Sequence, residues 1–220
     1  MSTEPISGGL WFFIAKGGLL MIPLIILSIV ALTIALAKFW ELWRFRTRLN
    51  KLTKRLYAFV QDGNISGALQ TSREDETALG RVFESAVIHR AQERGDVTRR
   101  LERLGGDVIA ELESYMSALA SIIGVAPMIG FLGTIIGLIK AFMNWETIGD
   151  RITINVLAGG IYEAMITTAA GLMVAIPYYL IYNHLTGKIA NLTRLTEEHT
   201  EEFVDLIAET NVKEPVRHAL

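Results

Sequence analysis

Two stretches of this chain, of 21 and 26 residues, contain no Asp, Glu, Lys or Arg, and a third, longer stretch contains only Glu163. About 20 apolar residues are enough for a helix to cross the hydrocarbon core of a bilayer. The pattern therefore predicts an all-α integral membrane protein. The three transmembrane helices are expected at residues 18–38, 118–142 and 158–183.

The chain is 51% hydrophobic and still 20% charged, with the charges gathered outside these stretches. Within 39–59 and 184–209, apolar residues recur at three- and four-residue steps, so we expect both segments to continue the adjacent spans as helices. The same pattern predicts a helix over 77–116 that runs directly into the second span. Its weak points are expected at Gly95-Asp96 and Gly105-Gly106. Three transmembrane helices extended by long cytoplasmic helices are thus the predicted architecture.

Basic residues set the expected orientation. Thirteen of the 21 Lys and Arg residues fall between Arg44 and Arg103, in the segment that joins the first and second spans. The positive-inside rule places this segment in the cytoplasm and the N-terminus outside, and three spans then put the C-terminus in the cytoplasm. The expected domains outside the membrane are an external segment 1–17, a cytoplasmic segment 39–117, an external loop 143–157 and a cytoplasmic helix and tail 184–220.

The first span is expected to stay in the mature protein. Ala35-Leu36-Ala37 does resemble a signal-peptide cleavage site, but the apolar run is longer than a signal sequence needs and no basic region precedes it. Trp40 and Trp43 have the placement of interfacial anchors. Residues 10–14 are expected to form a short amphipathic helix in the outer interface. Anionic lipid head groups are the expected contacts of the first basic residues after the span, which are Arg44, Arg46 and Arg48.

Small residues follow one another at helical spacing on the second and third predicted spans. Such strips let membrane helices approach closely, because shape fit drives their association. On the second span the strip contains Ala126, Gly130, Gly133, Gly137 and Ala141. On the third span it contains Gly160, Ala164, Thr168, Gly171 and Ala175. Pro127 and Pro177 are expected to mark kinks whose freed carbonyl groups are covered by packing.

Four polar side chains lie within these apolar helices: Thr134, Glu163, Thr167 and Thr168. Counting from the midpoints of the spans places Thr134 and Thr168 about 5 Å to the external side of the centre, where they would form one polar layer. Glu163 lies further out, on the neighbouring strip with Thr167. The ordinary alternatives are that each threonine bonds a carbonyl one turn back and that the glutamate is structural. A charged residue at the bilayer centre costs about 2.5–3.5 kcal/mol, which favours a functional role as lining of an ion path.

The same residues carry a family resemblance. The segment from Ala126-Pro127 through Gly133-Thr134 to Gly137 resembles the AP..GL.GT..G signature of the MotA/TolQ/ExbB proton channel family. The segment that begins at Glu163-Ala164 and ends at Pro177 resembles its EAL..TA.GL.VAIP signature, although Tyr178-Tyr179 replaces the usual small residues after the proline. Three spans rather than four resemble the ExbB/TolQ branch more than the flagellar MotA branch.

This resemblance implies a ring-shaped homopentamer in the bacterial inner membrane, which places the external side in the periplasm. The ring would enclose the single transmembrane helices of an ExbD- or TolR-like dimer, packed against the small-residue strips and Pro177. An aspartate of that partner would take and release the ion, with Thr134, Glu163 and Thr168 lining the path around it. Proton flow would then energise a TonB- or TolA-like protein. Sodium in place of the proton, and TolQ in place of ExbB, stay open as alternatives.

Other functional classes find little support in the sequence. A P-loop lysine motif and a GxSxG motif are absent, the four histidines are scattered, and the chain has no cysteine for disulfides or thiolate metal sites. We expect no enzyme activity, no metal site and no cofactor other than the transported ion. The basic segment also contains Glu74-Asp75-Glu76, so nucleic acid is not an expected partner. A self-contained ion channel or transporter and a non-conducting membrane scaffold are the rival hypotheses.

Overall fold

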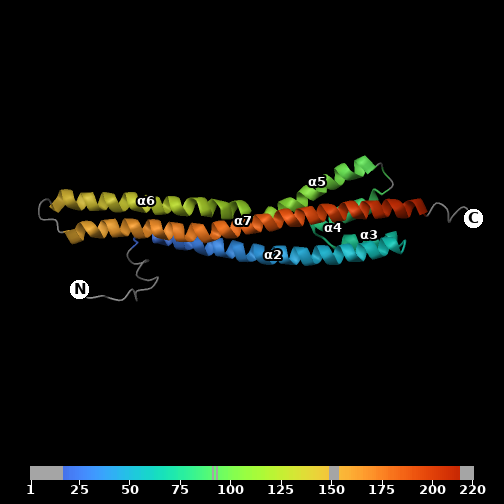
Figure 1. The fold of residues 1–220 in the computed structure, drawn as a ribbon, viewed down its shortest axis with the longest axis horizontal. Coiled ribbons are helices and arrows are strands. Elements are labelled where there is room, and N and C mark those ends of the chain that lie inside the picture. The colour runs from blue at the N-terminus through green and yellow to red at the C-terminus, as the bar shows by residue number, and fades with distance from the viewer. Residues whose placement is uncertain (1–16, 91, 93, 149–153, 214–220) are drawn as a thin grey trace, which may run out of the picture. The chain divides into compact units, whose positions relative to one another are not determined.

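The computed structural model describes residues 17–90, 92, 94–148 and 154–213 (Figure 1). The segment expected to be an interfacial helix, 10–14, lies outside the described residues, as do 149–153 of the expected external loop and the tail from 214. The described residues form six α-helices: α2 (Met21–Gln61), α3 (Ile65–Glu74), α4 (Ala78–Ile88), α5 (Arg94–Glu113), α6 (Met116–Ile148) and α7 (Ile154–Lys213).

Among the described residues, α2, α6 and α7 each contain a segment long and apolar enough to cross a membrane. α2 has 41 residues and α7 has 60, so both helices continue well beyond these segments. This confirms that 39–59 and 184–209 extend the first and third spans as helices. The described chain divides into an apolar unit, residues 17–37 and 115–183, and a polar unit, residues 38–114 and 184–213.

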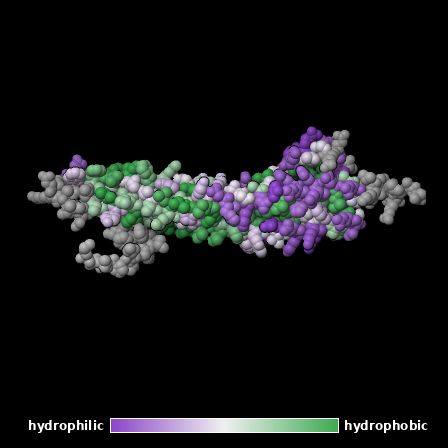
Figure 2. All heavy atoms as spheres, in the orientation of Figure 1, coloured by the Kyte–Doolittle hydropathy of each residue, from purple (hydrophilic) through white to green (hydrophobic). Residues whose placement is uncertain are grey.

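The apolar unit is built from the first part of α2, from α6 and from the first part of α7. Met21, Leu24 and Ala126 form a buried cluster, with Ala170 and Val174 packed against it. Large apolar side chains cover the outside of this unit, and Figure 2 shows the hydrophobic surface over α6 and the first part of α7. Exposed apolar surface of this kind marks contact with lipid or with another protein.

The polar unit is built from the second part of α2, from α3, α4 and α5, and from the second part of α7. Its core contains Leu49, Leu56, Phe83 and Phe203, all buried. The Phe83 and Phe203 rings meet edge to face with centroids 5.2 Å apart, an arrangement that aromatic pairs prefer. Hydrophilic side chains cover the surface over α3 and α5 (Figure 2).

The expectation of one helix from residue 77 into the second span is wrong. The helix is interrupted after Ile88 and again at Ser114 and Tyr115, where Tyr115 adopts a left-handed φ of 61°. Gly105-Gly106, an expected weak point, lies inside α5 instead. Each glycine costs about 1 kcal/mol in a helix interior, and the burial of Leu101, Val108 and Leu112 on the inner face of α5 offsets that cost.

The break at Ser114 has a cause in another helix. Lys38 of α2 is only 1% exposed, and its Nζ donates to the carbonyl oxygen of Leu112 at 3.2 Å and to the Oγ of Ser114 at 2.8 Å. The same ammonium pairs with Glu41 at 2.8 Å. The last carbonyl groups of a helix have no partner within it and accept bonds from lysine side chains. Lys38 therefore satisfies the end of α5 and stabilises its termination there.

Candidate functional site

The two small-residue strips meet where α6 and α7 pack against each other in the apolar unit. A Cβ atom added at Gly130 would lie 3.1 Å from the Cα of Thr168, and one added at Gly171 would lie 2.6 Å from the carbonyl oxygen of Ala126. A Cβ at Gly137 would lie 2.8 Å from both the Cβ of Ala164 and the carbonyl oxygen of Gly160. Larger residues would hold the backbones apart, so the strips are what permits this contact.

Each of the three threonines near this contact makes a different hydrogen bond. The Oγ1 of Thr168 donates across the interface to the carbonyl oxygen of Gly130 at 2.9 Å. The Oγ1 of Thr167 bonds the carbonyl oxygen of Glu163 at 2.7 Å and that of Gly17 at 3.0 Å. The Oγ1 of Thr134 bonds the carbonyl oxygen of Phe131 in its own helix at 2.6 Å. Thr134 thus makes the ordinary local bond of threonine in a helix, whereas Thr167 and Thr168 link different segments.

The expected common layer of Thr134 and Thr168 is offset in the structure. Thr168 lies beside Gly130, and Thr134 lies four residues further along α6, about 6 Å along the helix axis. The reason is the register of the two helices, which pairs Gly133 with Thr167 and Gly137 with Ala164. The two threonines therefore lie about one helical turn apart along α6 and not in one layer.

Glu163 is held between three segments. Its Oε1 accepts from the Nζ of Lys140 on α6 at 2.7 Å. On the side of α2, a Cβ atom added at Gly18 would lie 2.2 Å from the same oxygen. Gly18 also has a φ of +70°, a conformation that costs glycine little. The turn before α2 and the side chain of Lys140 thus enclose the carboxylate, whose side chain is 26% exposed.

Sequence reasoning missed two parts of this arrangement, Lys140 and the Gly17-Gly18 turn. Lys140 falls inside the predicted span 118–142, and Gly18 is the first residue of the predicted span 18–38, so neither stands out as a site residue. The register of α6 against α7 aligns Gly137 with Gly160 and Ala164 and so brings Lys140 close to Glu163, and the sequence alone does not display that register. We call Gly18, Lys140, Glu163, Thr167 and Thr168 the Glu163 cluster.

The remaining residues expected at the site lie within α6 and α7. Ala126, Gly133, Ala164 and Ala175 are buried in the contact between helices, while Pro177 is exposed inside α7. The helix continues through Pro177, as α6 does through Pro127. Whether these residues also pack around partner helices stays a prediction.

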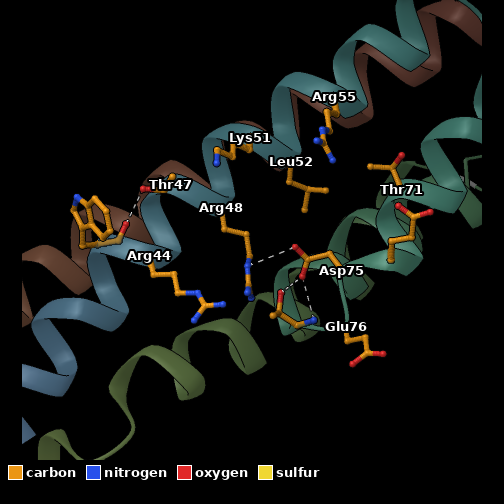
Figure 3. Close-up of a pocket in the computed structure, with 12 residues that line it drawn as sticks. Arg44, Thr47, Arg48, Lys51, Leu52, Arg55, Thr71, Asp75 and Glu76 are labelled. Atoms are coloured by element: carbon orange, nitrogen blue, oxygen red, sulfur yellow. Dashed lines mark hydrogen bonds and ion pairs between the residues drawn. The ribbon is translucent and has the colours of Figure 1, made fainter.

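A second feature lies in the polar unit, where a groove of about 850 Å³ separates α2 from the segment 71–77 (Figure 3). Arg44 and Arg48 line it, but Arg46, the third arginine expected at lipid head groups, does not. The Nε of Arg48 lies 3.8 Å from the Oδ2 of Asp75. The expected head-group arginines therefore fall on two different faces of α2.

The fold and the Glu163 cluster define a multi-span helical membrane protein with an ion pair between two closely packed helices of its apolar unit. Residues 74–198 match the MotA/TolQ/ExbB proton channel family, and the chain belongs to that family. It is therefore a protein of a channel family and not an enzyme, and its curated relatives place it in the ExbB/TolQ branch.

Three relatives illustrate this similarity. The chain is 31% identical over 174 residues to the putative biopolymer transport protein ExbB-like 1 of Synechocystis, covering 78% of this chain and 68% of the relative. It is 29% identical over 201 residues to the biopolymer transport protein ExbB of Pseudomonas putida, covering 86% and 59%. It is 34% identical over 99 residues to the Tol-Pal system protein TolQ of Haemophilus influenzae, covering 45% and 43%.

Proposed function

We propose that this chain is the pore-forming, stator-like subunit of an ion-driven motor in the bacterial inner membrane. The observation that carries the proposal is the Glu163 cluster, in which a carboxylate lies within an apolar unit, enclosed by Lys140 and the Gly18 turn. Ionisable groups among membrane helices are costly and mark ion or proton pathways. Thr167 and Thr168 continue this polar path along α7 by bonding carbonyl groups of neighbouring segments.

A motor of this kind needs a second titratable group on the path. Within the described residues of the apolar unit, the charged side chains are Lys140, Glu146 and Glu163, and Lys140 is already paired with Glu163. The second group would come from the aspartate of an ExbD- or TolR-like dimer with one span per chain. A homopentamer of this chain would enclose that dimer, and the movement of the dimer would energise a TonB- or TolA-like protein. The relatives named for biopolymer transport and for the Tol-Pal system support this assignment.

The polar unit would lie in the cytoplasm and the Glu163 cluster toward the periplasm. The supporting observation is the run of basic residues that follows the apolar part of α2, of which Arg44, Arg48, Lys51 and Arg55 line the groove of the polar unit. The proton is the ion that we propose for transport, with no other cofactor, because the ammonium of Lys140 already occupies the carboxylate that a sodium ion would need as a ligand.

Ion flux in liposomes tests this proposal. The full-length chain, alone or co-expressed with its single-span partner, would be reconstituted under a proton or a sodium gradient. We expect proton flux only with the partner, and we expect its loss in Glu163→Gln. Glu146→Gln is the matched control, because Glu146 is an exposed glutamate of the same unit outside the cluster.

Two other results would replace the motor role, and a third would change only the ion. Flux from this chain alone would make it a self-contained channel. Full activity of an energised complex that carries Glu163→Gln would make the chain a scaffold. A flux that follows the sodium gradient would change the assigned ion and leave the motor role in place.

A further inference from the structure

Four cations line one face of the groove in the polar unit. They are Arg44, Arg48, Lys51 and Arg55, and all belong to α2. Their steps of four, three and four residues put them on one side of the helix, within reach of one another. Figure 3 shows Arg44 and Arg48 projecting from the same side of α2, with Arg48 reaching toward Asp75.

The opposite wall of the groove is acidic, with Glu74, Asp75 and Glu76, and two of these three carboxylates have partners. Asp75 pairs with Arg48 and accepts from the backbone N–H of Thr77 at 3.2 Å. Glu74 accepts from the side chain of Gln70 at 3.1 Å. On the basic wall, by contrast, Arg44, Lys51 and Arg55 have no carboxylate within ion-pair distance among the described residues.

The unpaired cations favour an anion, and their geometry favours phosphate. Guanidinium groups bind phosphate oxygens through two parallel hydrogen bonds, and a lysine ammonium adds a point charge. A groove of about 850 Å³ has room for a phosphate-bearing head group. The hydroxyl-bearing Thr71 lines the same groove and offers a neutral hydrogen-bond donor.

The groove begins close to the end of the apolar part of α2. Arg44 is six residues beyond Lys38, the first charged residue after the apolar part of α2, which is about 9 Å along the helix. Trp43 lines the groove at the same end and is 65% exposed. Tryptophan is enriched at the boundary between membrane and water.

We propose that this groove is a binding site for a phosphate monoester or diester, held by Arg44 and Arg48 with Lys51 beside them. The source that the position of Trp43 favours is an anionic phospholipid of the leaflet next to the polar unit. The site lies entirely within the polar unit and includes no residue of the Glu163 cluster. The proposal does not depend on the motor role. It assigns lipid binding to a defined groove, which Arg46 does not line.

Arg46 provides the control that separates a site from general electrostatics. It carries the same charge as Arg44 and Arg48 and lies between them in sequence, yet it does not line the groove. Binding would be measured on the purified full-length protein in detergent by titration with short-chain phosphatidylglycerol. The readouts are Trp fluorescence and the number of lipids retained per subunit in native mass spectrometry.

We expect saturable binding by the unmodified chain. The affinity should fall about tenfold in Arg44→Gln and in Arg48→Gln, since each variant loses a charge-assisted contact. In Arg46→Gln the affinity should be unchanged. Asp75→Asn should bind at least as tightly as the unmodified chain, because it removes the competitor for Arg48. An equal loss in Arg46→Gln, non-saturable binding, or weaker binding in Asp75→Asn would overturn the site.

Inorganic phosphate and short-chain phosphatidylcholine separate the possible sources. Binding of phosphate with the same dependence on Arg44 and Arg48, and no preference for the lipid, supports the anion site and assigns it to a soluble ligand. Preference for phosphatidylglycerol over both probes assigns it to an anionic lipid. Equal binding of phosphatidylcholine by every variant would show that the acyl chains alone are bound, and would overturn the proposal.

Discussion

The Nζ of Lys140 lies 2.7 Å from the Oε1 of Glu163, and this pair of residues, 23 positions apart in sequence, joins α6 to α7. The carboxylate is also enclosed by the turn at Gly18. One oxygen atom of Glu163 therefore contacts structure from all three apolar helices or the turns before them. We therefore expect a substitution at one of these residues to alter the energetic contribution of the others.

Exchange of the two charges tests this coupling. Lys140→Glu and Glu163→Lys each place two like charges together, so each should lower the free energy of unfolding and the yield of folded protein. The double exchange restores opposite charges and should recover about 1–2 kcal/mol relative to the sum of the single variants. Thermal unfolding in detergent measures this coupling. If the effects of the two exchanges simply add, the pair contributes nothing to stability.

Gly18→Ala is expected to displace the carboxylate of Glu163. The new Cβ would lie 2.2 Å from Oε1, so the side chain must move, and the φ of +70° adds a backbone cost of about 1 kcal/mol. Gly63→Ala is the matched control, because Gly63 has a φ of +71° with nothing within 4 Å of the added Cβ. This backbone cost should lower the free energy of unfolding of both variants, which thermal unfolding measures. Proton flux should fall only in Gly18→Ala, and an equal fall in both would show that Glu163 is not disturbed.

Periodicity was enough to predict the three spans, the continuation of α2 and α7, and the small-residue strips. These features depend on residues three or four apart, which a single sequence displays directly. It was not enough for the break at Ser114, because Lys38, which satisfies the end of α5, comes from another helix 76 residues earlier. It also missed the pairing of Lys140 with Glu163 and the offset of Thr134 from Thr168. Both depend on the register of α6 against α7, which local patterns do not fix.

Lys38→Met is expected to destabilise the polar unit. Methionine keeps the aliphatic volume but leaves the carbonyl oxygen of Leu112 and the Oγ of Ser114 without their donor. Unsatisfied buried polar groups cost about 1–3 kcal/mol each, so we expect a loss of about 2–3 kcal/mol. Lys188→Met is the control, since Lys188 is exposed and its ammonium lies over the ring of Phe39 at 4.5 Å. Its loss should be below about 1 kcal/mol. Urea unfolding followed by circular dichroism would reveal whether the two variants differ as expected.

Tyr57 gives the polar unit a dependence on alkaline pH. Burial raises the pKa of its phenol well above the ordinary value, and the hydrogen bond from its Oη to Glu202 at 2.9 Å adds to this effect. The folded chain therefore keeps the proton above about pH 10, where the tyrosine of an unfolded chain releases it. Since the unfolded state then binds fewer protons, the contribution of Tyr57 is fully present below about pH 10 and is lost as the pH rises above it. In Tyr57→Phe this part of the alkaline loss should disappear, while the loss from other groups remains. Unfolding free energies of both proteins at pH 8 and at several values above 10 provide the comparison, and parallel curves would show that the phenol of Tyr57 is not the group responsible.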